Sequence, residues 1–233
     1  VYPAQADIER LQAALDIPMP NSGCNGEDVI EFIDTLGSPA TVASAGGRYF
    51  GFVTGGALPC TVAANWLASA WDQNGFSMTS SPAIALFEQA ALTWLKEVLD
   101  LPPELEGTLV TGGTMANFSC LAAARHAVLD QVGWDVESQG LAGAPEITVI
   151  AGEHAHASIY KVLALLGLGT ERVQTVEVDD QGRIIAHRIP QITGPTIVCL
   201  QSGNVNSGAF DLAAEIIPAL REKGAWVHVD GAF

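Results

Sequence analysis

The sequence has little positive charge. It contains 10 lysine and arginine residues against 26 aspartate and glutamate residues, for a net charge of −16. A chain this acidic repels nucleic acid and anionic membrane surfaces, and no cluster of basic residues breaks the pattern. We therefore expect neither nucleic acid nor a membrane among the partners of the protein.

Cysteine is also scarce. The four cysteines, Cys24, Cys60, Cys120 and Cys199, lie far apart and form no C-x-x-C pair. Cys120 and Cys199 fall in apolar segments, so we expect both to be buried free thiols. This usage favours a cytoplasmic protein over a scaffold held by disulfides.

Several familiar signals are absent from the sequence. No apolar run reaches the length of about 18 residues that a membrane span needs. There is no G-x-G-x-x-G, Walker or G-x-S-x-G motif, and no internal repeat. The composition, 48% hydrophobic and 15% charged, is typical of a folded chain and not of a disordered one.

The residue pattern before residue 100 predicts mainly helices. Residues 1–36 predict a helix, a loop and a second helix, and further helices are expected over 61–71 and 82–99. The glycine-rich segment 44–56 carries aromatic residues, which line a pocket, contact another subunit or simply pack. We assign residues 1–75 to an N-terminal helical arm with this pocket or interface segment.

Residues 76–233 are assigned to an α/β domain, because strand and helix patterns alternate from residue 107 onward. Strands are expected over 108–111, 147–151, 173–178, 195–200 and 225–229, and helices over 114–129, 158–166 and 212–222. This alternation predicts a mainly parallel sheet with helices on both faces. Ligands of such sheets bind at the carboxyl ends of the strands. Those ends are expected at residues 111–114, 153–156, 202–206 and 230.

Residues 107–129 predict an anion site. A strand over Thr108–Thr111 is broken by Gly112 and Gly113, and Thr114 then suits the N-cap of a long helix. The glycines let backbone N–H groups approach a ligand, and the positive end of the helix dipole favours a phosphate. The same residues also fit an ordinary turn between a strand and a helix.

Other polar groups stand at the remaining strand ends. Asp230 follows an apolar run, so we expect it to be buried beside a cation or hydrogen-bond donors, or to cap the next element. His154 and His156 are spaced i, i+2, as are His228 and Asp230, so on extended backbone each pair points to one side. This spacing permits a metal site, a histidine stacked on a planar ligand, or a histidine satisfied in the core. The loop 202–208 either offers donors to a ligand or only connects two elements.

Taken together, these segments resemble the group II pyridoxal-phosphate-dependent amino acid decarboxylases, a family of the aspartate aminotransferase superfamily with fold type I. The matching segments occur in the order and at the spacing of that family and cover nearly the whole chain. They are RYFGFV (48–53), SSPAIALFEQAALTWL (80–95), LVTGGTMANFSCLAAARH (109–126), EHAHASIYKVLALLGLG (153–169), SGNVNSGAFD (202–211) and WVHVDGAF (226–233).

The resemblance implies pyridoxal 5'-phosphate as the cofactor and gives roles to particular residues, with no metal. Gly113 and Thr114 would hold the phosphate, and Ala232 would lie against one face of the ring. His156 would stack on the other face, and Asp230 would pair with the protonated ring nitrogen; these two are the expected catalytic residues. Asn204 would approach the edge of the ring.

The resemblance also implies an activity and an assembly. The substrate would be an L-amino acid, whose amine forms a Schiff base with the cofactor before CO2 leaves and the ring takes up the electrons. Enzymes of this fold build their sites across the interface of a homodimer. Two alternatives stay open: a carbon–carbon lyase that uses the same cofactor, and a catalytically inactive module of the same fold.

The sequence departs from the family pattern at two points. Met115 stands where many relatives have an acidic residue. The Schiff-base lysine of the family lies beyond the segment that matches residues 226–233, and none of Lys96, Lys161 and Lys223 lies in a matching motif. We therefore expect the sequence to be incomplete at both ends, with the lysine and the following small domain outside it.

Overall fold

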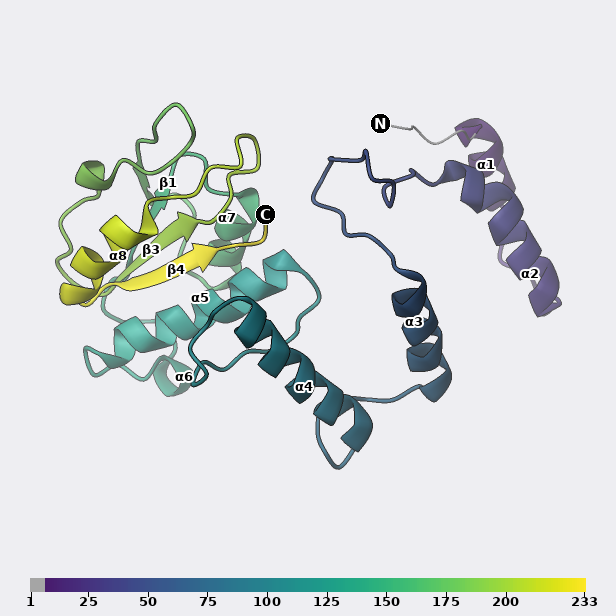
Figure 1. Ribbon diagram of the computed structural model, residues 1–233, viewed down its shortest axis with the longest axis horizontal. Coiled ribbons are helices and arrows are strands. Elements are labelled where there is room, and N and C mark those ends of the chain that lie inside the picture. The colour runs from purple at the N-terminus through teal and green to yellow at the C-terminus, as the bar shows by residue number, and fades with distance from the viewer. Residues whose placement is uncertain (1–6) are drawn as a thin grey trace. The chain divides into compact units, whose positions relative to one another are not determined.

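The computed structural model describes residues 7–233, which divide into two compact units, residues 7–87 and 88–233 (Figure 1). The first is drawn in purple to dark blue and the second in teal to yellow. The predicted boundary between residues 75 and 76 lies inside the first unit, and helix α4 crosses the division.

The first unit is helical, as predicted. The helices are α1 (Ile8–Leu15), α2 (Gly26–Phe32), the short turns η1 (Ile33–Gly37) and η2 (Ser38–Ala40), α3 (Pro59–Trp71) and the beginning of α4 (Pro82–Val98). The side chains of Asp7 and Asn25 cap α1 and α2 by accepting hydrogen bonds from Arg10 N and Glu27 N. The predicted helix, loop and helix are confirmed over residues 7–36, and the rest of that prediction lies outside the described residues.

The aromatic segment 44–56 forms no regular element. Phe50 and Phe52 are 90% and 92% exposed, so these two rings do not pack within the unit. Phe52 and Val53 also have positive φ angles of 57° and 51°, a strained backbone for residues with side chains. That the segment lines a pocket or contacts another subunit stays a prediction.

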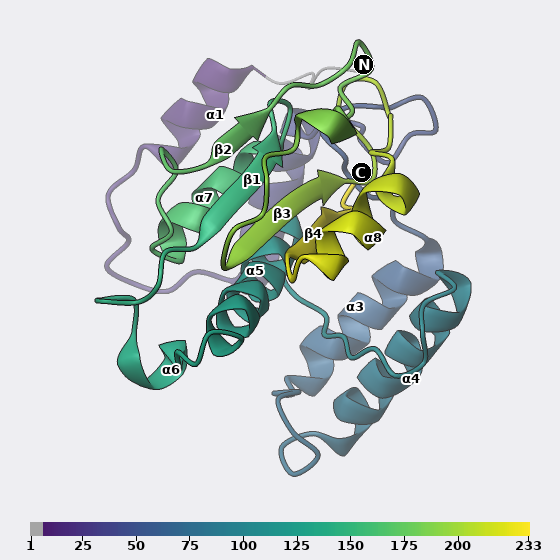
Figure 2. The same ribbon diagram turned by 90° about the vertical axis from the view of Figure 1, so that its left-hand side faces the viewer.

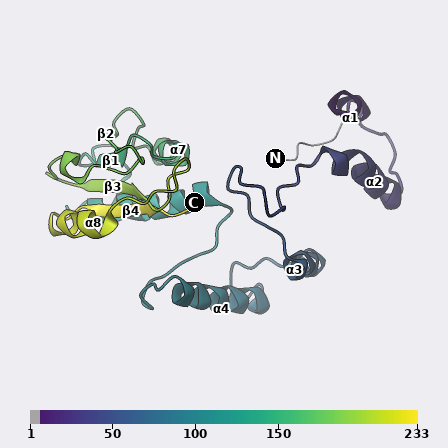
Figure 3. The ribbon, with the colours of Figure 1, turned by 45° about the horizontal axis from the view of Figure 1, so that its top comes forward.

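The second unit contains a parallel sheet of four strands. They are β1 (Thr148–Gly152), β2 (Gln174–Val176), β3 (Thr196–Gln201) and β4 (Trp226–Asp230), in the order β2-β1-β3-β4 shown in Figure 3. All the pairings are parallel, with Val149 opposite Ile197 and Cys199 opposite His228. The helices are the end of α4, α5 (Gly113–Asp130), α6 (Val136–Gln139), α7 (Ala157–Leu165), the short η3 (Ala186–Arg188) and α8 (Ala213–Glu222).

Helices cover both faces of the sheet, as predicted. Along β3, Ile197 and Cys199 join the core formed with α5 and α7, whereas Val198 and Leu200 join the core formed with α8. Alternate residues of a strand point to opposite faces, so both faces of this apolar strand are buried. Figure 2 shows α8 in front of the sheet and α7 behind it.

The predicted strand over residues 108–111 is wrong. These residues have no ladder partner in the described part of the chain, and Leu109 and Val110 are exposed. The backbone N–H of Leu109 instead donates to the Glu88 carboxylate at 3.2 Å. A β-branched run favours extended backbone, but a strand also needs a neighbour to bond. The prediction that Cys120 is buried is also wrong, because it lies on the exposed side of α5.

None of the helices in residues 7–233 combines the length and the apolar character that crossing a membrane requires. All four cysteines are free, as predicted for Cys120 and Cys199.

The cysteines should differ in reactivity. Burial raises the pKa of the Cys199 thiol to about 12, and the nearby Asp230 carboxylate adds to this effect. The thiolate is the reactive form, so an alkylating reagent should label exposed Cys24 and Cys60 in the native protein and Cys199 only after unfolding. Peptide mass spectrometry would measure this. Native labelling of Cys199 as fast as that of Cys24 would contradict the described burial.

Candidate functional site

The start of α5 presents free backbone donors. Gly112 is the N-cap, with φ 115° and ψ 173°, a conformation that favours glycine. The first intrahelical hydrogen bond runs from Ala116 N to Gly112 O, so the amides of Gly113, Thr114 and Met115 precede it. The prediction of Thr114 as N-cap is wrong, because the glycine backbone turns the chain two residues earlier.

Ala232 lies beside this helix start. A Cβ atom placed on Gly113 would be 3.5 Å from the Cβ of Ala232, an ordinary van der Waals contact. The two predicted site residues are therefore neighbours in space, although they lie far apart in the sequence. The chain after β4 passes next to the amides at the tip of α5.

Asp230 ends strand β4 next to the same helix. Its Oδ2 atom accepts a hydrogen bond from Asn117 Nδ2 at 3.1 Å, and its Oδ1 atom accepts one from Ala232 N at 3.1 Å. We predicted a buried carboxylate, but it is only half-buried, because it stands at the open end of the strand. It is oriented by two donors and still accessible to a ligand.

A buried side chain, that of Asn117, connects three elements of the unit. Its Nδ2 atom donates to Asp230 and also to Ser158 Oγ at 3.0 Å, and its Oδ1 atom lies 2.8 Å from His228 Nε2. Asn117 belongs to α5, Ser158 to α7, and Asp230 and His228 to β4. The amide therefore holds the polar ends of these elements together.

The predicted ring-stacking residue, His156, is the last member of this chain of contacts. It is the N-cap of α7, and its Nδ1 atom accepts from Ser158 N at 3.2 Å and lies 2.8 Å from Ser158 Oγ. The residue is exposed, so the imidazole is tethered at one nitrogen and open on its remaining surface. His156 and Asp230 thus share one network through Ser158 and Asn117.

The two i, i+2 pairs behave differently. His228 and Asp230 both contact Asn117, so the prediction that they point to one side is confirmed. For His154 and His156 it is wrong, because β1 ends at Gly152 and a turn follows. His154 Nδ1 lies toward Gly182, whereas His156 is bonded to Ser158. Within residues 7–233, no three His, Cys, Asp or Glu side chains are grouped to hold a metal ion.

Asn204 is buried but stands apart from the network. Its Oδ1 atom accepts from Asn206 N at 2.9 Å and Ser207 N at 3.3 Å, so it stabilises its own loop. Its Nδ2 atom is buried, has no hydrogen-bond partner in the described chain and points toward Gly182. The structure brings Gly113, Thr114, Ala232, Asp230 and His156 together, and no hydrogen bond of the described residues joins Asn204 to Asp230 or His156.

Sequence reasoning missed Asn117 and Ser158, and it assigned the N-cap of α5 to Thr114 instead of Gly112. The signal for Asn117 is its position on the buried stripe of α5, four residues before Leu121. A polar residue on an apolar helix face needs a hydrogen-bond partner, so it points to a buried network.

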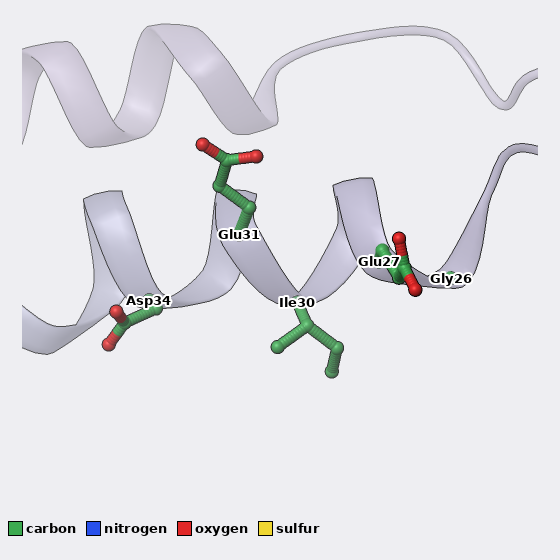
Figure 4. A pocket seen from close by; sticks show the side chains of 5 residues that line it. All are labelled: Gly26, Glu27, Ile30, Glu31 and Asp34. Carbon is green, nitrogen blue, oxygen red and sulfur yellow. The ribbon is translucent and has the colours of Figure 1, made fainter.

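The first unit contains a hollow that is a poor candidate for a phosphate site (Figure 4). It is lined by Gly26, Glu27, Ile30, Glu31 and Asp34. In Figure 4, the Glu31 and Asp34 side chains extend in different directions, so the acidic side chains do not converge on one point. Its negative charge would repel a phosphate.

Comparison with known proteins identifies the family of the chain. The family model described as "Pyridoxal-dependent decarboxylase conserved domain" matches residues 12–233. The chain belongs to the pyridoxal-dependent decarboxylase family. Family membership confirms the predicted resemblance, the fold type and the cofactor, pyridoxal 5'-phosphate.

Members of the family resemble the chain in sequence and in structure. The acidic amino acid decarboxylase GADL1 of Homo sapiens is 27% identical over 233 residues, which cover 97% of this chain and 44% of that protein. The crystal structure of mouse CSAD has a TM-score of 0.86 at 26% identity, covering 98% of this chain and 48% of that one. The crystal structure of Oryza sativa TDC with PLP and tryptamine has a TM-score of 0.83 at 22% identity, covering 98% and 50%. The chain spans about half the length of these relatives.

The residues of this chain fit the cofactor of the family. The free amides of Gly113 and Thr114 suit a phosphate, and the absence of a side chain on Gly112 leaves room for it. The accessible carboxylate of Asp230 suits a protonated ring nitrogen. The open imidazole of His156 suits one face of a flat ring.

His228 should affect stability at mildly acidic pH. Burial lowers its pKa, and the Asp230 carboxylate only partly opposes this. The unfolded chain then binds the proton more tightly, so the free energy of unfolding should fall as the pH drops from about 6.5 toward the lower folded pKa. Denaturant unfolding across this range, with a His228→Gln variant that cannot titrate here, would measure the contribution.

The matched control for this experiment is His187→Gln, at an exposed position of η3. The control should keep the pH dependence of the unmodified protein, and His228→Gln should lose part of it. Equal slopes in both variants would contradict the assigned burial of His228.

Proposed function

We propose that the protein to which this chain belongs is a pyridoxal-phosphate-dependent decarboxylase of an L-amino acid. The observation that carries the proposal is the hydrogen-bonded group formed by Asp230, Asn117, Ser158 and His156 next to the free amides of α5. A phosphate site, a carboxylate and an aromatic ring are the features needed to hold one pyridoxal phosphate molecule.

Each residue contributes an elementary physical effect. The amides of Gly113 and Thr114, at the positive end of the α5 dipole, bind the phosphate dianion. The carboxylate of Asp230 keeps the proton on the ring nitrogen through charge attraction. His156 and Ala232 would confine the ring from its two faces.

Once bound, pyridoxal phosphate supplies an aldehyde for the substrate amine and a ring that accepts the electron pair left when CO2 departs. The residues of this chain orient the group and set its charge. Asp230 is itself oriented by Asn117 Nδ2 and Ala232 N, so its free lone pairs have a fixed direction.

The choice of decarboxylation is supported by the human relative GADL1, which is named an acidic amino acid decarboxylase. We propose an amino acid substrate without assigning its side chain. We further propose a cytoplasmic homodimer. The free cysteines favour the cytoplasm, where thiols stay reduced. The exposed rings of Phe50 and Phe52 provide apolar surface for a contact between two copies of the chain.

Replacing Asp230 should weaken cofactor binding. In Asp230→Asn the carboxylate is lost at nearly constant shape, which removes the partner of the ring nitrogen. We expect the affinity for pyridoxal phosphate to fall roughly thirtyfold, since losing one partner of a desolvated charge pair costs about 2 kcal/mol. Titration followed by the absorbance of the cofactor would measure this, with Asp180→Asn at an exposed turn as the control. Equal affinity of both variants would contradict the role of Asp230.

Replacing Gly112 should deform the phosphate site. Alanine at φ 115° is strained by about 1 to 3 kcal/mol, so Gly112→Ala should bind pyridoxal phosphate more weakly and unfold at a lower temperature. Gly194→Ala is the matched control, because nothing lies within 4 Å of its added Cβ and its φ is not positive. Unchanged binding by Gly112→Ala would count against the site.

Activity assays of the whole protein would separate decarboxylation from its alternatives. The protein, loaded with pyridoxal phosphate, would be given the common L-amino acids while released CO2 and amine are measured. Formation of both supports the proposal. An aldehyde fragment without CO2 would indicate a carbon–carbon lyase, and bound cofactor without any product would indicate an inactive module.

A further inference from the structure

The side chain of Asn117 has only one favourable orientation in the structure. A carboxylate accepts hydrogen bonds and cannot donate them, so the NH2 group of Asn117 must face Asp230 Oδ2, 3.1 Å away. Its carbonyl oxygen therefore faces His228, which donates from Nε2 at 2.8 Å. A rotated amide would place two oxygens against each other.

The same orientation sets the direction of the next hydrogen bonds. The second N–H of Asn117 donates to Ser158 Oγ at 3.0 Å, so that oxygen acts as an acceptor on this side. The hydroxyl proton of Ser158 is then free to point to His156 Nδ1, 2.8 Å away. Nδ1 also accepts the backbone N–H of Ser158 at 3.2 Å. With both donors aimed at Nδ1, the proton of the neutral ring belongs on Nε2.

We propose that Asn117 is a positioning residue, which fixes the Asp230 carboxylate and the Nε2–H tautomer of His156 through one directed set of hydrogen bonds. The value of this arrangement for catalysis rests on the proposed function. The hydrogen bonds themselves are properties of this chain alone.

Burial makes the arrangement stiff. Asn117, Ser158 and His228 are 4%, 7% and 5% exposed, so water does not readily replace a lost partner. A change at any of them leaves a buried polar group unpaired or reverses the direction of a hydrogen bond. The exposed parts of the network, His156 and one side of Asp230, are those expected to meet the cofactor.

The inference can be tested without cofactor by nuclear magnetic resonance. Long-range proton–nitrogen correlation spectra of the nitrogen-labelled chain report which imidazole nitrogen carries the proton. We expect His156 and His228 to be Nε2–H tautomers in the unmodified chain. A proton on Nδ1 of His156 would overturn the proposal before any variant is made.

Variants separate positioning from mere support of the fold. Asn117→Asp keeps the shape but loses the NH2 donors, so the hydroxyl of Ser158 should turn to the new carboxylate. His156 Nδ1 then keeps only the longer hydrogen bond from Ser158 N, at 3.2 Å, and the share of the Nδ1–H tautomer should rise. Ser158→Ala should have the same effect on His156 while His228 keeps its tautomer. Asn74→Asp, the same change at an exposed loop position of the first unit, should alter neither histidine.

Unchanged spectra of His156 in a folded Asn117→Asp or Ser158→Ala variant would overturn the proposal. If Asn117→Asp does not fold, the His156 tautomer measured in Ser158→Ala and in the unmodified chain still tests the proposal. Failure of the unmodified protein to bind pyridoxal phosphate would refute the proposed function alone, because the tautomers are measured without the cofactor.

Discussion

The buried amide of Asn117 holds helix α5 against the end of strand β4 and the start of helix α7. It is the point at which the second unit changes from an apolar core to a polar site. Below it, toward the middle of α5, the helix continues with Leu121 and Ala124, which pack on the sheet. Above it lie the free amides of the helix tip. One turn of helix therefore separates the groups that stabilise the fold from those that bind a phosphate.

This arrangement explains why groups distant in sequence act together. In a parallel sheet every strand ends at the same edge, so the residues after β1 and β4 come close to the helix that precedes the sheet. The sheet gives only approximate proximity. The hydrogen bonds of Asn117, Ser158 and Ala232 N convert it into fixed distances of about 3 Å between neighbours.

Much of this fold was predictable from the sequence, because the spacing of apolar residues shows which faces of helices and strands are buried. The buried strand over 195–200 and the helix over 212–222 were found nearly to the residue, since both are long and clearly patterned. The run over 108–111 was misread because local β propensity does not say whether a neighbouring strand exists. The motifs predicted Gly113, His156 and Asp230 as site residues, and the structure places them around one group of contacts. Asn117 and Ser158 were missed, because their importance lies in contacts between distant segments.

The central claim is that the tip of α5, Asp230 and His156 form one binding site for pyridoxal phosphate. A crystal structure of the whole protein with this cofactor tests it most directly. The account predicts a phosphate bonded to the amides of Gly113 and Thr114, a ring nitrogen within hydrogen-bond distance of Asp230, and the imidazole of His156 stacked on the ring. A cofactor bound elsewhere, or a ring nitrogen turned away from Asp230, would contradict it.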